Sequence, residues 1–516
     1  MFKKALAFKL KLFVAIVFIL ILAQLTTAYV FGFIAKKQET LQFNKLTSSP
    51  LIKVIKHEYH RGLFSSDDSA EITVNNVYIS NVAKLLFKHD TESQLISNAY
   101  TIKYSTHIEH GLFAGILNGY FVPTVAYSKT TINYPEDIKK TLAQFFKTDE
   151  PLKVENLIYL NKSGFYKISS PAFLYSEAVS GVKITWGGLS FLMQYNKEFD
   201  RFKSRLAVPC FELSAPTKGE ILLHNLDFSL SSKNSENMIS VGKTSLTVKL
   251  LKVEWKDKLV LNFSPGDMLH MFTGINATDF LNRIDAINPS AFAFNNVTYN
   301  SDSNDENSFL TMNAKASFNS LVTNDKTYGP MNFDLSLQHI QSKSFSKMID
   351  KLQYLSNKSD NENNDLTKDQ MLSTIKTYFV PILANKPLIK LNQFTLDTDT
   401  GRIDLHGFAT TNNFVPSDIN DQHSFTRKLI VDLNMSVPKS VLSYIFILQM
   451  KYLLTSGNAS MDEQSSKALT KVVNILLDNQ VNGWVKKGYL YNNNNLLSTH
   501  LVMKDGVLYL NDKLSK

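Results

Sequence analysis

The chain has 516 residues, 44% of them apolar and 20% charged, a composition that allows several folded domains and excludes disorder of the whole chain. Its one cysteine, Cys210, excludes an intramolecular disulfide framework and any metal site built from several cysteines. The net charge is +9, but residues 1–37 contain six lysines and no acid, and removing those six from the 55 basic residues leaves 49 against 46 acids. Because no basic stripe is visible in the remainder, we expect no nucleic-acid partner.

An apolar segment near the N-terminus predicts a membrane anchor. Residues 12–34 run for 23 residues without a charge, and a helix of that length reaches roughly 34 Å, more than the roughly 30 Å of a hydrocarbon core. Four lysines precede the run and two follow it, so the positive-inside rule places residues 1–11 in the cytoplasm and the bulk of the chain outside. A signal peptide cleaved after Ala28 is the alternative, but the apolar pattern resumes at Tyr29 and favours an uncleaved anchor.

Alternation of apolar and polar residues dominates the middle of the chain. It predicts strands that bury one face and expose the other, as in an antiparallel sheet. The clearest examples are residues 221–230, 246–250, 333–337 and 431–435. Two hairpins are also predicted, one joining 388–396 to 403–405 through a turn at 397–401, and one joining 501–503 to 507–510 through a turn at 504–506.

Apart from the N-terminal segment, helical spacing clusters in the second half of the chain. It predicts helices over 369–379, stopped or kinked at Pro381, and over 441–454 and 464–484, the last two forming a helical hairpin. Segments rich in Asn, Asp and Ser, at 300–308 and 356–369, predict loops. The expected fold is therefore α+β, predominantly antiparallel β-sheet, with a few amphipathic helices in the C-terminal half and one N-terminal transmembrane helix. We expect a β-rich region over 38–355 and an α+β region over 367–516 that continues the same sheet.

A short motif occurs twice. His60-Arg61-Gly62-Leu63-Phe64 is echoed by His110-Gly111-Leu112-Phe113, and each copy lies between alternating segments. Two similar turns at strand ends, each with a Leu-Phe anchor, explain this best. Glycine at such a turn indicates a positive φ or a close backbone approach.

These residues carry a resemblance to a known family. The anchor, the run Glu58 to Ser66 with Tyr59, His60, Arg61, Gly62 and Phe64, and the later His110-Gly111 resemble the YdgA-like family of bacterial inner-membrane-anchored periplasmic proteins, a domain of unknown function. The segments 379–389 and 506–511 resemble later parts of that family, whereas Leu112 stands where the family tends to have proline. The resemblance implies a single-pass inner-membrane protein with the bulk of the chain in the periplasm of a Gram-negative bacterium. It supplies no catalytic residue, so the motif is interpreted as a structural turn rather than an active site.

Other constellations predict no catalytic or metal chemistry. His57 and His60, like His107 and His110, are three apart, and strand geometry points such pairs to opposite faces instead of gathering them around zinc. Cys210 follows a proline in an apolar setting, and Gly187-Gly188 lacks the Lys-Ser/Thr of a phosphate loop. Asp397, Asp399 and Asp404 fit solvated groups of a hairpin. We therefore expect no catalytic residues, no metal and no cofactor.

Three classes of function remain open. The first is a non-catalytic envelope protein that acts through protein contacts or self-association. The second is a carrier or chaperone that binds lipid or another hydrophobe along a curved sheet, suggested by the 35 phenylalanines and the membrane tether. The third is a hydrolase without a recognisable motif. The expected partners are the inner membrane through the N-terminal helix, with a second copy of the chain and a lipid as further candidates.

Overall fold

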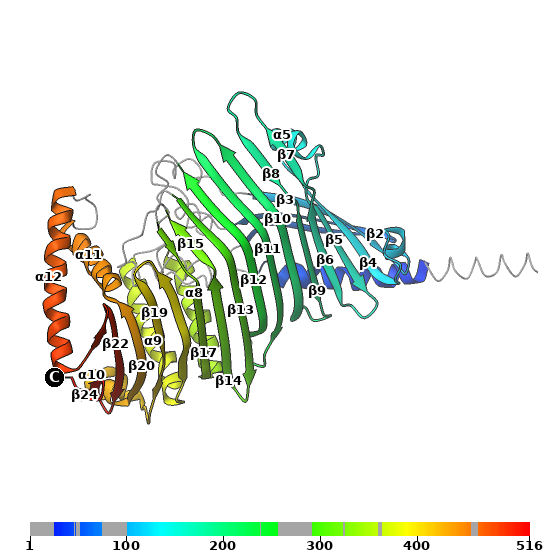
Figure 1. Ribbon diagram of the computed structural model, residues 1–516. Helices are drawn as coiled ribbons and strands as arrows, with labels where there is room; N and C mark the ends of the chain where they lie inside the picture. The colour runs from blue at the N-terminus through cyan, green and yellow to red at the C-terminus, as the bar shows by residue number, and fades with distance from the viewer. Residues whose placement is uncertain are drawn as a thin grey trace, which may run out of the picture. The chain divides into compact units, whose positions relative to one another are not determined.

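The computed structural model describes residues 25–45, 47, 52–74, 101–237, 239–255, 291–323, 326–359, 364–455 and 463–515. These residues form two compact units (Figure 1). Unit 1 contains the described residues up to Glu212 together with Asp227–Lys233, and unit 2 contains Leu213–Leu226 and the described residues from Asn234 onward. The strand β11 (Gly219–Asn234) is divided between them.

Unit 1 is an antiparallel sheet in which neighbouring strands follow one another along the chain. Its strands, in order of pairing, are β1 (Ile52–Arg61), β2 (Ser65–Val74), β3 (Thr101–His110), β4 (Thr124–Ile132), β5 (Lys153–Tyr159), β6 (Gly164–Ser170), β9 (Leu189–Tyr195) and β10 (Arg201–Ala215). A hairpin joins β7 (Phe173–Ser176) to β8 (Lys183–Trp186), and β8 also pairs with β10. Because side chains alternate along a strand, this sheet presents two different faces to its surroundings.

Each face of the unit 1 sheet is covered by a different element. A helix over residues 25–45 packs on one face, where Ala35, Ile108, Val125, Ala126 and Ile158 form a buried cluster. On the other face, the short helix α4 (Ala114–Leu117) and Tyr120 pack against Tyr127, Leu157 and Phe165. The helix α5 (Glu136–Phe146) contacts β7 through Phe145 and Phe146 on Phe173.

Unit 2 is also built on antiparallel strands. Its main strands, in order of pairing, are β12 (Ser240–Trp255), β13 (Ala291–Glu306), β14 (Phe309–Phe318), β17 (Met331–Gln341), β18 (Leu388–Thr398), β19 (Gly401–Thr411), β20 (Leu429–Pro438), β22 (Leu496–Lys504), β23 (Val507–Leu510) and β24 (Lys513–Leu514). The short strands β15 (Ser320–Thr323), β16 (Lys326–Tyr328) and β21 (Tyr491–Asn493) pair with β13, β15 and β22, respectively.

Helices lie beside two parts of the unit 2 sheet. The helices α8 (Ser342–Ser359) and α9 (Asn364–Ala384) supply Phe345, Met348, Phe379 and Ile382 to a core with Leu310 and Ile340. The helices α11 (Lys439–Thr455) and α12 (Glu463–Lys487) pack near β22, where Leu477 and Val481 meet Leu497. A 3₁₀ turn, η1 (Pro416–Asn420), and α10 (Gln422–Lys428) connect β19 to β20.

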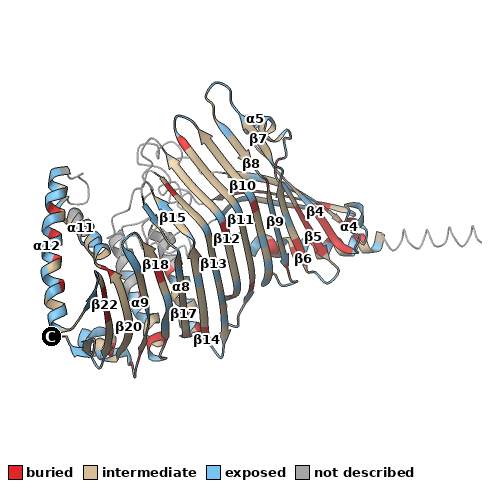
Figure 2. Cartoon of the chain, viewed as in Figure 1, coloured by how far each residue is buried: buried red, intermediate tan, exposed pale blue. Residues whose placement is uncertain are grey.

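Between these helix pairs, one face of the sheet carries a series of apolar side chains that cross-strand pairing places side by side. Phe333, for example, is opposite Phe394, and Phe394 is opposite Leu405. We call this set the apolar ladder; its members are Phe333, Leu335, Leu391, Phe394, Leu396, Ile403, Leu405, Leu433 and Leu501. Every member is half-buried rather than buried (Figure 2). The apolar ladder is thus only partly covered by the described residues.

The predominantly antiparallel sheet is confirmed, as are both predicted hairpins. β18 and β19 pair across a turn at Asp399-Thr400. β22 and β23 pair across a turn at Asp505-Gly506, and these two residues both have a positive φ. The predicted helices near 441–454 and 464–484 are α11 and α12. The sheet continues from the expected β-rich region into the C-terminal region because β17 pairs with β18.

Several details differ from the expectation. Residues 300–306 are not a loop but the end of β13, because their polar side chains alternate outward and their backbone pairs with β14 as far as Glu306. The segment 356–369 is helical over its described residues, and α9 continues past Pro381 to Ala384. The helix α5 in unit 1 was also not predicted, because its region was expected to contain only strands.

The predicted anchor over residues 12–34 is only partly within the described chain. Residues 25–34 are helical, and the helix continues to residue 45, whereas residues 1–24 lie outside the described residues. Among the described residues, no helix is long and apolar enough to cross a membrane.

Candidate functional site

The N-terminal helix over residues 25–45 lies along the unit 1 sheet and forms the centre of the candidate site. Ala28 and Ala35 have no exposed surface, and Gln38 and Gln42 are also buried. These residues are spaced by three, four or seven positions, so they share one face of the helix, and that face meets the sheet. The opposite face exposes Tyr29, Val30 and Phe33.

His110, the last residue of β3, holds the first turns of this helix. Its Nδ1 lies 2.9 Å from the carbonyl oxygen of Ala28, 82 residues earlier in the chain. A carbonyl only accepts, so Nδ1 carries the proton and donates it, and Nε2, 3.3 Å from Ser66 Oγ, accepts from that hydroxyl. Burial lowers the pKa of His110, which favours this neutral form although the bond to Ala28 acts the other way.

Gly32, one turn after Ala28, leaves the space that the His110 ring occupies. A Cβ at this position would lie 2.9 Å from His110 Cε1 and 3.2 Å from both ring nitrogens. The approach of an imidazole to the helix backbone therefore depends on a residue without a side chain. The sequence interpretation did not single out Gly32, because within an apolar run a glycine is a common residue of membrane helices.

Arg61 and Tyr59 of β1 contact the same helix farther along. The Arg61 guanidinium lies 3.7 Å from the ring centroid of Phe33 and 5.0 Å from that of Tyr29. Its Nη1 also donates a hydrogen bond of 3.3 Å to the Tyr29 carbonyl oxygen. Tyr59 packs on the buried cluster around Ala35, with the Lys36 ammonium 5.5 Å from its ring.

The two motif turns have different backbone roles. At Gly62 a Cβ would meet the carbonyl oxygen of Ser65 at 2.8 Å, which is a close backbone approach, whereas Gly111 has a φ of 134°. The two turns are adjacent, since the Phe64 carbonyl oxygen accepts a hydrogen bond of 2.9 Å from the His110 amide. Of the seven motif residues, Tyr59, Arg61 and His110 thus contact the helix, and Gly62, Phe64 and Gly111 shape the turns beside it.

A buried polar cluster holds the second half of the helix. Glu39 Oε1 accepts hydrogen bonds from Asn156 Nδ2 at 3.1 Å and Ser128 Oγ at 3.4 Å. Gln42 accepts from the same Asn156 amide at 3.1 Å and from the Tyr166 hydroxyl at 2.5 Å. Gln38 reaches the Lys197 carbonyl oxygen at 3.2 Å. These contacts satisfy the side-chain oxygens of Glu39 and Gln42, which would otherwise be costly to enclose, whereas the buried Gln42 Nε2 has no hydrogen-bond partner among the described residues.

Burial raises the pKa of Glu39 to about 7, and the carboxylate of Asp68 adds to the rise, while Asn156 and Ser128 oppose it. Burial likewise raises the pKa of Asp68, although His57 Nε2, 2.7 Å from Asp68 Oδ1, lowers it. The His57 ring in turn stacks on Phe43 of the helix with 3.8 Å between ring centroids. The contact between the helix and the sheet therefore contains a carboxyl group, that of Glu39, whose pKa lies near neutral pH.

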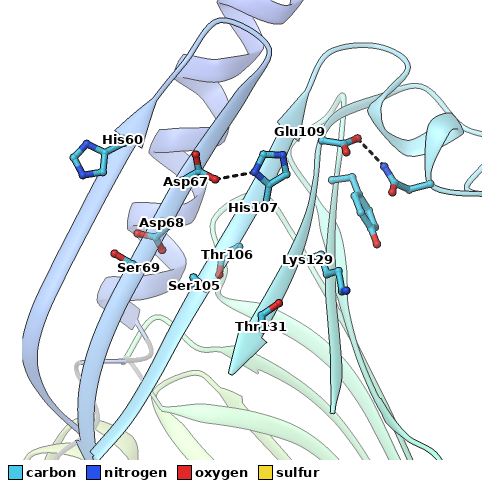
Figure 3. Close-up of a pocket in the computed structure, with 12 residues that line it drawn as sticks. His60, Asp67, Asp68, Ser69, Ser105, Thr106, His107, Glu109, Lys129 and Thr131 are labelled. Atoms are coloured by element: carbon cyan, nitrogen blue, oxygen red, sulfur yellow. Dashed lines mark hydrogen bonds and ion pairs between the residues drawn. The ribbon is translucent and has the colours of Figure 1, made fainter. Parts of the chain in front are cut away.

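The opposite face of the sheet holds a polar pocket of about 330 Å³ (Figure 3). His60, Asp67, His107, Glu109 and Lys129 lie around it, and His107 Nδ1 is 2.7 Å from Asp67 Oδ1. A hydrolytic triad would also need a hydroxyl or thiol bonded to the free nitrogen of such a histidine. Among the described residues that line this pocket, no hydroxyl makes that bond to His107.

The two histidine pairs, His57 with His60 and His107 with His110, are each divided between the two faces of the sheet, as strand geometry predicts. His57 and His110 point to the helix, and His60 and His107 line the opposite pocket. Within the described part of the chain, no three His, Cys, Asp or Glu side chains are grouped as metal ligands.

The remaining sequence candidates lie apart from this site. Asp397 pairs with Arg402, Asp399 lies 3.5 Å from Lys326, and Asp404 lies 3.3 Å from His406, all as partly exposed groups of the hairpin. Cys210 is a free thiol whose Sγ would lie 2.8 Å from a Cβ at Gly187.

Comparison with known proteins identifies the family but no function. The model of a family described as a bacterial protein of unknown function (DUF945) matches residues 9–515. A search of the curated proteins found no match. The matched segment includes the helix over 25–45, both motif turns and the closing β-hairpin, the features on which the YdgA-like resemblance was based. The chain therefore belongs to the DUF945 family of bacterial proteins of unknown function.

Proposed function

We propose that this chain is a non-catalytic envelope protein that is tethered to the inner membrane by its N-terminal segment, lies mostly in the periplasm, and acts through protein contacts. The tether is supported by the uncharged apolar run that leads into the helix over 25–45 and by the seating of that helix on unit 1. A non-catalytic role is supported by the two described faces of the site, one filled by the helix and the other without an activated nucleophile.

One observation carries the proposal of protein contacts. The helices α11 and α12 expose large apolar side chains that no described residue covers. On α11 these are Tyr444, Ile445, Phe446 and Leu454, and on α12 they are Val472, Ile475 and Leu476, all between 43% and 60% exposed. Clusters of this kind on a soluble surface mark interaction sites, and single exposed apolar residues do not. We propose that a second copy of the chain covers this surface.

The oligomeric mass of the full chain in detergent tests this proposal. Wild-type protein should form a defined oligomer on native mass spectrometry, and Ile475→Ser with Leu476→Ser should shift it to the monomer. Asn479→Ser is a matched control, because Asn479 is also exposed on α12 but polar, and it should leave the oligomer intact. A wild-type chain that is monomeric at cellular concentration would refute self-association.

A second candidate, a carrier of lipid or another hydrophobe, is favoured by the half-buried apolar ladder of unit 2. An acyl chain lying along it would remove apolar surface from water on both partners. Native and lipid mass spectrometry of the full chain should then detect phospholipid near one per chain, and Leu433→Gln should reduce it. Asn434→Gln, which points to the other face of β20, is the control, and a wild-type chain free of lipid would exclude this candidate.

A further inference from the structure

The two motif turns of unit 1 carry an apolar surface that neither the fold nor the site explains. Leu63 and Phe64 at the first turn are each 47% exposed, and Leu117 and Phe121 after the second are 79% and 88% exposed. Neither the turn 62–64 nor the segment 111–123 contains a charged residue. Exposed apolar side chains on uncharged loops are unfavourable in water and are typical of surfaces that contact a membrane or a partner.

Both turns lie beside the first described residues of the N-terminal helix (Figures 1 and 2). His110, just before the second turn, bonds to Ala28, and Arg61, just before the first turn, contacts Phe33 and Tyr29. The apolar turns therefore lie next to residues 28–33 of the helix. At the same place along the helix, Tyr29 and Phe33 add exposed aromatic surface. Immediately before these residues runs the apolar sequence predicted to enter the membrane.

The length of that sequence places these turns at the membrane surface. The predicted span covers residues 12–34, but residues 28–34 already lie along unit 1, which leaves 12–27. At about 1.5 Å per residue these 16 residues reach roughly 24 Å, less than the roughly 30 Å of a hydrocarbon core. A span that is too short draws its flanking residues toward the apolar layer.

We infer that the turns 62–64 and 111–123 form a rim that enters the headgroup and upper acyl region of the phospholipid bilayer in which the N-terminal segment is anchored. The inference rests on the proposed anchor and adds a second contact to it. The apolar side chains of the rim would be removed from water in the membrane interface. Interfacial amphipathic helices bind in the same way, with their apolar face about 5–10 Å deep in the boundary between headgroups and acyl chains. Tyr29, which is half exposed beside the turns, supplies an aromatic ring of the kind that favours the headgroup level. Such a rim would fix unit 1 against the membrane instead of leaving it on a free tether.

Fluorescent probes at single cysteines in the full chain test the rim. In a Cys210→Ser background, an environment-sensitive fluorophore is placed by Leu117→Cys, Phe121→Cys or Leu63→Cys. The chain is reconstituted in vesicles of phosphatidylethanolamine and phosphatidylglycerol, with or without lipids that carry a nitroxide on the acyl chain. Val179→Cys, on the β7–β8 hairpin of the same unit, is the matched control, since Val179 is 97% exposed and lies away from the start of the helix (Figure 1). Val17→Cys reports on the anchor itself.

The rim predicts that probes at 117, 121 and 63 show blue-shifted emission and lose most of it to the nitroxide lipids, while the probe at 179 keeps its emission. The rim would be refuted if the probe at position 17 were quenched while the probes at 117, 121 and 63 emitted like the control probe at 179. In that case the anchor would still be supported. A blue shift at 121 without quenching would also refute it, because protein and not lipid would then cover the turn. Absence of quenching at 17, with a chain that does not float with the vesicles, would refute the anchor and the rim together.

Discussion

The buried carboxyl of Glu39 makes the seating of the N-terminal helix dependent on pH. The pKa of this group rises from 4.5 to about 7 in the folded chain, mainly through burial. Between those values Glu39 binds more protons in the folded state than in the unfolded state, so its contribution to stability is full below pH 4.5 and is lost as the pH rises through about 7. Asp68, whose pKa is also raised by burial, contributes a change of the same sign.

The magnitude follows from the two pKa values. The difference between 4.5 and about 7 corresponds to roughly 3–4 kcal/mol at about 1.4 kcal/mol per pKa unit. Because Glu39 as a residue keeps some exposure, solvent screening reduces this value, and we expect about 1–3 kcal/mol, a factor of about 5–150 in the opening equilibrium of the helix. Glu39→Gln removes the titrating group and keeps an amide oxygen that can accept from Asn156 and Ser128.

Hydrogen exchange of residues 25–45 in the full chain, followed from pH 5 to pH 8.5 and corrected for intrinsic exchange, measures this opening. Glu39→Gln should protect the helix more than the wild type does above pH 7 and nearly equally at pH 5. Glu58→Gln is the control, because Glu58 is an exposed residue of β1 that pairs with Lys56 at 2.8 Å, and it should not alter the pH profile of the helix. Identical profiles for the wild type and Glu39→Gln would refute the assignment of the pH dependence to this carboxyl.

Three further predictions concern packing and processing. Leu157→Ala in the core of unit 1 should cost about 2–5 kcal/mol, seen as lost exchange protection in β5 and β6, whereas Leu174→Ala at an 80% exposed position should change stability by about 0.5 kcal/mol at most. Gly407→Ala should disrupt β19–β20 pairing, because a Cβ there would lie 2.1 Å from the Asp432 carbonyl oxygen. Gly483→Ala in α12 is the control: its Cβ meets no atom within 4 Å, and the substitution should raise the melting temperature through a gain of about 1 kcal/mol in stability. The intact mass of protein from bacterial membranes should retain residues 1–28, since Ala28 bonds to His110, and a chain that begins at Tyr29 would contradict the uncleaved anchor.

Local sequence pattern was sufficient for the elements with strict periodicity. The alternation over 388–396 and 431–435 identified strands, and Asp505-Gly506 identified a turn, because side-chain direction in a strand and φ in a turn are properties of a few adjacent residues. The same pattern argument predicted that His57 and His60 face opposite sides of the sheet. It failed at 300–306, where the Asn, Asp and Ser residues indicated a loop by composition, although pairing with β14 holds them in a strand; residues 307–308 form the turn that follows.

The role of the motif was decided only by the tertiary structure. The sequence by itself determined that the chain starts with an apolar segment, continues as an antiparallel sheet and repeats a turn motif at residues 60–64 and 110–113. It did not show that His110 meets Ala28 and Gly32, because that contact joins residues about 80 positions apart and depends on strand register and on the helix face that meets the sheet. The sequence interpretation missed Glu39 for the same reason. A single acidic residue after an apolar run looks like any solvated carboxylate, and its raised pKa arises only when Asn156 and Asp68 of distant strands surround it. Burial and charge environment arise from such long-range contacts, and with them the chemistry of the site.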